Sequence, residues 1–257
     1  MLDTRRSVSE LSKWCMEKDY CLTESEVGLL SSDPRAAVRR LAQRALRARE
    51  SRNEDERMLA LERSMWGLGF KRILGMDEVG RGALAGSVCV GGVIFAVNGM
   101  VPAGVRDSKS LSPAQRAALV PRIVAAAIAH RVVCRDNSFV DSNGINAAIE
   151  DCQQQIIDEL KPDYLLLDGF ALSVSALPQQ AMAKGDSKSV TIAAASILAK
   201  EHRDAVMKRL CPVYPAYDFS QNKGYGSSTH IDAVREHGPC AIHRLSFLQG
   251  VLGSVKE

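Results

Sequence analysis

The sequence lacks the features that mark disulfide-stapled, zinc-binding, secreted or membrane proteins. Its seven cysteines are odd in number and have no paired spacing, which argues against a disulfide framework. No Cys-x-x-Cys pair or Cys/His cluster occurs, so a structural zinc site is not expected. The amino terminus has no apolar core of a signal peptide, and no apolar run is long enough to span a bilayer. We therefore expect a reduced, cytoplasmic protein with no membrane partner.

The chain also has no strong net charge, no internal repeat and no low-complexity tract. Its formal charge of +3 is too small to identify a nucleic-acid partner, and its 257 residues can bury one sizeable core with a smaller appendage. The charge is unevenly distributed, because seven arginines and a single acid, Glu50, lie between Arg35 and Arg52. Such a segment is typical of a surface that contacts phosphates, and it is equally compatible with a solvated helix face.

Residues 1–66 have helical patterns only. Ser32-Asp33-Pro34 is a helix start signal, and the stretch from Glu54 to Trp66 reads as a further helix that ends before Gly67 and Gly69. Apolar residues recur at helical spacing in two stretches, at Leu11, Trp14 and Cys15 and at Val38, Leu41, Ala42 and Ala45. Since large apolar residues are few, we predict a small all-helical amino-terminal extension over residues 1–66.

Residues 67–257 have the mixed pattern of an α/β domain. Runs rich in Val, Ile and Leu predict strands over 71–76, 87–97, 130–139 and 164–168. Helices are predicted over 113–129, 145–160, 190–210 and 229–237. Three early strands followed by alternating helices and strands indicate an α/β fold with a mixed sheet.

Two adjacent carboxylates, Asp77 and Glu78, follow the apolar run that ends at Met76 and precede the turn Gly80-Arg81-Gly82. Charges beside an apolar core are costly unless a cation compensates them, and carboxylates suit Mg²⁺. Arg81 offers donors for phosphate, and the glycines allow a close backbone approach. An ordinary strand end with a solvated acidic turn explains the run equally well. Since neighbouring strand residues face opposite sides, one site for both acids requires the strand to end or bend there.

A second strand ends in an acid, at Asp168-Gly169. Ligands of open α/β sheets collect beyond the carboxyl ends of the strands, so Asp77 and Asp168 together favour a metal site. On the long helix, Ser196, Lys200 and Asp204 share one face. Lys188 and Ser189 precede that helix, where a phosphate would be stabilised.

Over about residues 70–250, the sequence resembles bacterial ribonuclease HII, because several motifs of that family recur in the same order. The matching segments are Asp77-Glu-Val-Gly-Arg-Gly82, Asp107-Ser-Lys109, Asp168-Gly169, Lys184-Gly-Asp-Ser-Lys-Ser189, Ile192-Ala-Ala-Ala-Ser-Ile197, Ala199-Lys200, Arg203-Asp204, Asn222-Lys-Gly-Tyr-Gly226, Thr229-His230, and Gly238-Pro239 to His243-Arg-Leu-Ser-Phe247. The resemblance implies a ribonuclease H-like, five-stranded mixed sheet flanked by helices, forming a catalytic domain over residues 67–257. The helical extension resembles that of one subgroup of the family.

By this resemblance, the four metal-binding and catalytic acids are Asp77, Glu78, Asp168 and Asp204, with Asp77 bridging two Mg²⁺ or Mn²⁺ ions. Asp186 competes with Asp204 for the fourth place, and we expect Asp186 to serve the loop instead. Two divalent ions about 4 Å apart would activate a water and stabilise the leaving oxygen of a phosphodiester.

Substrate contacts are expected from the Gly80-Arg81-Gly82 turn, which can reach a 2′-hydroxyl, and from Tyr225, whose family counterpart packs on a sugar. Ser108, Lys109 and Lys188 are candidates for holding phosphates. Two prolines common in the family are replaced by Ala83 and Ser87. The match at Asn146 is partial.

The resemblance implies a monomeric endoribonuclease that cuts the RNA strand of RNA–DNA hybrids and cuts 5′ of ribonucleotides embedded in duplex DNA. Two alternatives stay open: a ribonuclease HIII-type hybrid nuclease, and a hybrid-binding protein without catalysis. The all-helical extension argues against ribonuclease HIII, whose extension contains a sheet. The four intact acids argue against a non-catalytic protein.

Overall fold

The computed structural model describes residues 5–173 and 175–252, and its contacts divide the chain between Arg57 and Met58 into two compact units. The helix that crosses this division, α3 (Ala36–Gly67), contributes its first part to the amino-terminal unit and its last part to the second unit. From the sequence, we instead predict the boundary between the helical extension and the catalytic domain after residue 66. That boundary stays a prediction, as do an extension and a catalytic domain with separate roles.

The amino-terminal unit consists of α1 (Val8–Glu17), α2 (Glu24–Ser31) and the first part of α3. Reciprocal capping boxes begin the two short helices, with Ser7 and Glu10 at α1 and Thr23 and Glu26 at α2. A buried apolar cluster joins the three helices, made of Leu11, Cys15, Leu22, Val27, Leu30, Val38, Leu41, Ala42 and Ala45. The predicted helical extension is therefore confirmed, and it has an apolar core of its own.

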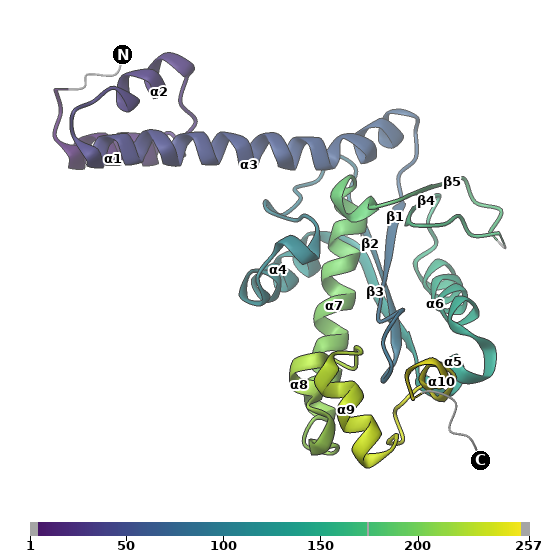
Figure 1. The fold of residues 1–257 in the computed structure, drawn as a ribbon. Helices are drawn as coiled ribbons and strands as arrows, with labels where there is room; N and C mark the ends of the chain where they lie inside the picture. The colour runs from purple at the N-terminus through teal and green to yellow at the C-terminus, as the bar shows by residue number, and fades with distance from the viewer. Residues whose placement is uncertain (1–4, 174, 253–257) are drawn as a thin grey trace. The chain divides into compact units, whose positions relative to one another are not determined.

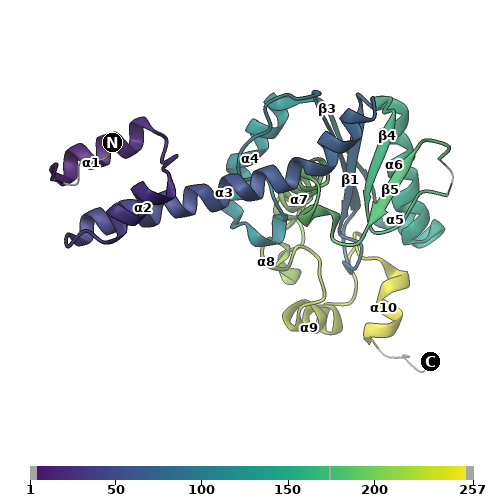
Figure 2. The same cartoon turned by 90° about the horizontal axis from the view of Figure 1, so that it is seen from above.

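The second unit is built on a five-stranded mixed sheet in the order β3-β2-β1-β4-β5. Its strands are β1 (Ile73–Val79), β2 (Val88–Phe95), β3 (Ala127–Arg135), β4 (Tyr164–Asp168) and β5 (Gln179–Met182). The first three pair antiparallel, whereas β4 and β5 run parallel to β1 on its other side (Figure 2). This is the mixed sheet expected from the sequence.

Two long helices cover opposite faces of this sheet (Figure 1). On one face α6 (Ile145–Leu160) packs on β2 and β3, in an apolar cluster that also includes side chains of β1 and β4, and on the other face lies α7 (Val190–Leu210). The remaining helices are α4 (Pro113–Ala126), α5 (Asn137–Asn143), α8 (Phe219–Asn222), α9 (Ser228–His237) and α10 (Leu245–Leu252). Short 3₁₀ turns lie at Ser108–Ser110, Gly185–Ser187 and Pro215–Tyr217.

Three predicted elements are confirmed with the same first and last residues: the helices over 145–160 and 190–210 and the strand over 164–168. In contrast, α4 ends at Ala126 and β3 occupies Ala127–Arg135, so the strand predicted over 130–139 begins earlier and its last part is helix α5. The short strand β5 has no counterpart in the prediction, because its four residues include two glutamines and carry little strand signal.

Strand β1 does not end at Asp77 but continues through Glu78 to Val79. Its pairing with β2 continues to Val79, whereas its pairing with β4 stops at Met76 opposite Leu167. The edge of β1 that faces β4 is therefore open beyond Met76. Groups from either face of the sheet can approach each other around this open edge.

One pair of cysteines corrects the expectation of no disulfide. Cys89 on β2 and Cys134 on β3 lie directly opposite each other and form a disulfide, whereas five other cysteines are free. Spacing along the chain does not reveal such cross-strand neighbours, which lie 45 residues apart. Within the described residues, no helix is both long and apolar enough to cross a membrane.

Helix α7 lies unusually close to the sheet because small residues line the contact. A Cβ atom added at Gly75 on β1 would lie 2.3 Å from the backbone carbon of Thr191, and one added at Gly91 on β2 would lie 2.2 Å from the carbonyl oxygen of Ala195. Ala193, Ala194 and Ala195 are fully buried. These small residues allow the close approach of α7, which sets the position of the side chains that follow on the same helix.

The variant Gly91→Ala tests this contact. We expect a loss of about 1–3 kcal/mol in the free energy of unfolding, because the added methyl group collides with backbone rather than with a flexible side chain. Chemical denaturation monitored by circular dichroism measures the change. The control is Gly67→Ala, where no atom lies within 4 Å of the added carbon, and its change should stay within about 0.5 kcal/mol. Equal stability of Gly91→Ala and wild type would contradict the packing argument.

Candidate active site

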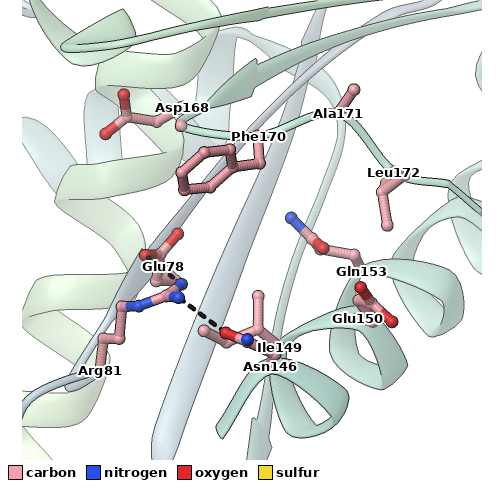
Figure 3. Close-up of a pocket in the computed structure, with 11 residues that line it drawn as sticks. Glu78, Arg81, Asn146, Ile149, Glu150, Gln153, Asp168, Phe170, Ala171 and Leu172 are labelled. Carbon is pink, nitrogen blue, oxygen red and sulfur yellow. Dashed lines mark hydrogen bonds and ion pairs between the residues drawn. The ribbon is translucent and has the colours of Figure 1, made fainter.

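Three of the acids singled out in the sequence lie where the pairing of β1 with β4 ends. Asp77 faces α7, where Ser196 donates a hydrogen bond to its carboxylate. Glu78, the next residue on the strand, lines a cavity on the opposite face with Asn146 and Gln153 of α6 (Figure 3). Glu78 and Asp168, the last residue of β4, both also line the cavity that contains Asp77. The open edge of β1 thus lets side chains from both faces form one acidic site.

A fourth acid, Asp186, comes to the same site from the 3₁₀ turn before α7. The N–H of Gly185 donates to Asp168 Oδ1 over 2.8 Å, which fixes this turn at the end of β4. Asp186 is buried, and its charge acts on Asp77 together with the charges of Asp168 and Glu78. The structure therefore brings together Asp77, Glu78, Asp168 and Asp186.

Asp204, named as the fourth acid from the sequence, lies elsewhere on α7. Its carboxylate forms an ion pair with Lys200 over 2.9 Å, and the main charges that act on Asp77 come from Asp168, Glu78 and Asp186 instead. It is separated from Ser196 by two turns of the helix, since the spacing is eight residues. The geometry favours Asp186 over Asp204 as the partner of the other three acids.

The acidic cluster carries negative charge that is strongly desolvated. Burial raises the pKa of Asp77 to about 7; the Ser196 hydrogen bond opposes this shift, and the charges of Asp168, Glu78 and Asp186 add to it. Burial also raises the pKa of Asp186 to about 6, with Asp107 and Asp168 contributing. For Glu78 the pKa is raised by burial, and Arg81 partly offsets the effect. Positive charge at this cluster would stabilise the ionised acids.

The donor chemistry of this cluster suits a hard divalent cation. Asp77, Glu78, Asp168 and Asp186 offer only carboxylate oxygens, the ligands that Mg²⁺ and Mn²⁺ prefer. Within residues 5–173 and 175–252, no three His, Cys, Asp or Glu side chains already have the geometry of a metal site. Because the acids repel one another when no cation lies among them, binding would draw them closer.

Beside the acids, the Gly80-Arg81-Gly82 turn lines the Asp77 cavity with Ser108, Lys109 and Tyr225. Gly80 has a φ of +87°, which favours glycine, and its N–H donates to the Tyr225 hydroxyl over 3.1 Å. The Ser108 and Ser196 hydroxyls lie 3.0 Å apart. The structure therefore gathers most of the substrate residues expected from the sequence around the carboxylates.

The side chain of Arg81 reaches toward Asn146 of α6 (Figure 3). Its Nη2 donates to Asn146 Oδ1 over 2.7 Å, and its Nη1 lies 3.5 Å from Glu78 Oε1. Asn146 thus holds the guanidinium beside an acid of the site. The partial sequence match at Asn146 gave no indication of this contact.

Lys188 is placed differently from the other candidates. It donates to the carbonyl of Ala183 over 2.8 Å and lines neither of the two cavities. The start of α7, where the sequence suggested a phosphate, is occupied by the buried Glu62. Its carboxylate accepts hydrogen bonds from Ser189 Oγ at 2.5 Å and from Thr191 N at 3.0 Å. Glu62 comes from the last part of α3, and no local sequence signal marks it as a cap for a distant helix.

Two fully buried arginines hold the loops that carry the glycine turn and Tyr225. Arg203 donates to the carbonyls of Ser87, Ala85 and Lys223 over 2.8–3.0 Å. Arg244 donates to the carbonyls of Gly86 and Arg81. Burial, together with the charge of Arg203, lowers the pKa of Arg244 to about 10. Both arginines belong to the motifs found in the sequence, but their positioning role becomes visible only in the fold.

Comparison with known proteins gives consistent matches over the second unit. A family model described as Ribonuclease HII matches residues 74–249. A ribonuclease HII of Caldicellulosiruptor saccharolyticus is 43% identical over 200 residues, covering 77% of this chain and 97% of that protein. A ribonuclease HII of Halalkalibacterium halodurans is 37% identical over 252 residues, covering 96% of this chain and 95% of that protein.

Solved structures show the same fold. The structure of a PCNA–RNase HII complex from Archaeoglobus fulgidus matches with a TM-score of 0.58 and 26% identity, covering 68% of this chain and 94% of that chain. The structure of Bst-RNase HIII in complex with Mn²⁺ matches with a TM-score of 0.52 and 18% identity, covering 71% of this chain and 69% of that chain. At the latter identity the likeness concerns the fold alone.

The raised pKa of Asp77 predicts how stability depends on pH when no divalent cation is present. A folded-state pKa above the unfolded value of 3.8 contributes stability at low pH that is lost as pH rises through about 7. Asp77→Asn should therefore be more stable than wild type at pH 8, and the difference should shrink toward pH 4. Thermal melting in EDTA measures both proteins, and added Mg²⁺ should raise the stability of wild type more. A constant difference across this range would contradict the prediction.

Proposed function

The chain belongs to the ribonuclease HII family, and from this premise we propose that it cuts both the RNA strand of RNA–DNA hybrids and the 5′ side of ribonucleotides embedded in duplex DNA. Membership makes it a ribonuclease H, an endonucleolytic hydrolase that acts on RNA–DNA hybrids. Cleavage would leave 3′-hydroxyl and 5′-phosphate ends. Single embedded ribonucleotides separate this activity from that of ribonuclease HIII, which cuts them poorly.

The observation that carries the proposal is the buried acidic cluster beside a glycine turn. Asp77, with its pKa raised to about 7, lies among Glu78, Asp168 and Asp186, and Arg81 beside Glu78 only partly offsets their charge. A fold retains such a cluster at a cost in stability when it serves to bind cations. We propose that these four acids hold two Mg²⁺ or Mn²⁺ ions in the catalytic complex, with Asp77 shared between them. The ions would activate the attacking water and stabilise the leaving oxygen.

The protein's own groups would orient the substrate. The turn at Gly80 presents backbone groups close to the acids, where a 2′-hydroxyl could be recognised. The Tyr225 ring lies over Arg203, with 5.2 Å between the guanidinium carbon and the ring centre, and its hydroxyl accepts from Gly80. A sugar packed on this ring would therefore lie beside the turn that reads the 2′-hydroxyl. Lys109, in the same cavity as Ser108, is suited to a phosphate.

We also propose a cytoplasmic monomer in which residues 67–257 form the catalytic domain and residues 1–66 an extension. The proposed substrate, chromosomal DNA with embedded ribonucleotides, supports the location. The cleavage site proposed here is formed by residues of one chain, which supports a monomer.

The assignment of the fourth acid can be tested with Asp186→Asn and Asp204→Asn. We expect Asp186→Asn to lower kcat by more than about 100-fold and to weaken the apparent affinity for Mg²⁺. Asp204→Asn should act only through Lys200 and cost no more than about 100-fold, without changing the metal dependence. Cleavage rates measured across a Mg²⁺ titration separate the two variants. If only Asp204→Asn shifts the metal titration, the assignment to Asp186 is wrong.

The proposed activity can be tested with labelled duplexes carrying one ribonucleotide, a full RNA strand, or DNA only. Wild type with Mg²⁺ or Mn²⁺ should cut the first two and leave the third intact, and EDTA should stop cleavage. Asp77→Asn should abolish cleavage but retain hybrid binding, because it removes the proposed shared ligand without removing the substrate contacts. Cleavage of the hybrid but not of the single ribonucleotide would favour a ribonuclease HIII-type activity. Binding without any cleavage would favour a hybrid-binding protein.

A further inference from the structure

The arginines between Arg35 and Arg52 fall into two groups in the structure. Four of them brace the amino-terminal unit: Arg35 pairs with Asp33, Arg39 donates to the carbonyls of Asp33 and Pro34, Arg49 pairs with Glu24, and Arg52 donates to the carbonyls of Asp19 and Tyr20. These four arginines therefore have partners within the amino-terminal unit. The other three arginines of the basic segment are not explained by such contacts.

The other three, Arg40, Arg44 and Arg47, are exposed and have no hydrogen bond or ion pair within the described chain. Their spacing of four and then three residues places them on one face of α3. The apolar cluster of the unit takes Val38, Leu41, Ala42 and Ala45 from α3, and at 100° per residue these lie on the opposite side of the helix. The three guanidinium groups therefore project outward; we call them the arginine stripe.

The surroundings of the arginine stripe set it apart from an ordinary solvated helix face. Such faces usually alternate the sign of charge and form pairs at spacings of three or four residues. Here the only acid at such a spacing is Glu50, three residues after Arg47, and no ion pair joins the two. Like charges at this spacing repel one another, so the stripe carries a cost that a polyanion would remove.

The rest of the unit confirms that positive charge is concentrated on this helix. Residues 1–34 carry seven acids and four basic residues, whereas residues 35–52 carry seven arginines and one acid. The stripe spans about 10 Å, at 1.5 Å per residue. A duplex carries one phosphate per about 1.7 Å of axis, so several phosphates would lie within reach of the three arginines.

We propose that the arginine stripe binds the phosphate backbone of a nucleic-acid duplex, independently of its sequence and of its sugar. The partner is the duplex on which the second unit acts, so the proposal rests on the proposed function. The three cations lie on a helix fixed by the core of the unit, and they can contact phosphates without losing any partner. The contribution is to affinity, and the chemistry at the acidic cluster does not depend on it.

The test is the triple variant Arg40→Gln, Arg44→Gln, Arg47→Gln in the full chain. Its matched control removes the same charge at three exposed positions outside the stripe, Lys13→Gln, Arg57→Gln and Arg122→Gln. Dissociation constants are measured by fluorescence anisotropy in EDTA, between 50 and 200 mM salt, for a hybrid and for a DNA duplex of equal length. Circular dichroism melting shows whether each variant folds like wild type.

We expect the stripe variant to lower the slope of log affinity against log salt by about two to three, which is the effect of losing three phosphate contacts. The loss should be equal for hybrid and DNA, and the control should keep the wild-type slope. An unchanged slope, or an equal change in the control, would overturn the proposal. A loss confined to the hybrid would also overturn it, because backbone binding does not distinguish the sugars.

Cleavage rates at saturating hybrid distinguish this proposal from the proposed function. The stripe variant should keep the wild-type kcat with Mg²⁺, because its substitutions lie outside the second unit. If wild type itself cuts no hybrid, the proposed function fails, while the salt slopes still decide on the stripe. If wild type cuts and the stripe variant keeps the full slope, the stripe proposal fails alone.

Discussion

The site depends on one constraint, the placement of mutually repelling carboxylates at a desolvated edge of the sheet. Asp77 can be buried there because the pairing of β1 with β4 stops one residue earlier, which leaves room for Asp168 and for the turn that carries Asp186. The same burial raises the pKa of Asp77 to about 7. In the fold, the raised pKa favours the protonated form of Asp77, whereas a bound divalent cation would favour the ionised form. The stability of the folded protein is therefore coupled to cation binding.

Positive charge is kept near this cluster but out of direct contact with most of it. Arg203 and Arg244 lie fully buried beneath the neighbouring loops and donate to backbone carbonyls, so they fix the glycine turn and the Tyr225 loop without neutralising the acids. Among the residues that the structure describes, Arg81 forms the ion pair with Glu78, and Asn146 holds its guanidinium from the other side. This arrangement leaves the carboxylates available for a metal while the loops proposed to contact the substrate stay held in place.

The sequence patterns placed the two strand acids, Asp77 and Asp168, at one edge of the sheet. They did not place Asp186, which lies in a turn, beside these two acids. Asp77 and Asp168 could be placed together because strand ends in an open sheet meet at one edge. Asp204 was expected as the fourth acid because Arg203-Asp204 resembles a family motif, yet on α7 it is two turns from Ser196 and pairs with Lys200. Asp186 reaches the cluster through a turn whose position depends on a hydrogen bond to Asp168, which no local pattern encodes. Glu62, which caps α7, and the disulfide between Cys89 and Cys134 depend on long-range contacts in the same way.

The sequence by itself carried the resemblance to the family, through motifs that recur in order, and it determined the longer strands and helices through their periodicity. The short strand β5 and helix α5 were missed, because so few residues carry little periodic signal. Only the tertiary structure shows which acids lie beside Asp77, which arginines are buried beneath the loops, and which arginines of α3 project outward. These features depend on which distant segments pack together and on which polar groups find a hydrogen-bond or ion-pair partner after burial. Local sequence patterns do not show either, because both arise only when the chain is packed.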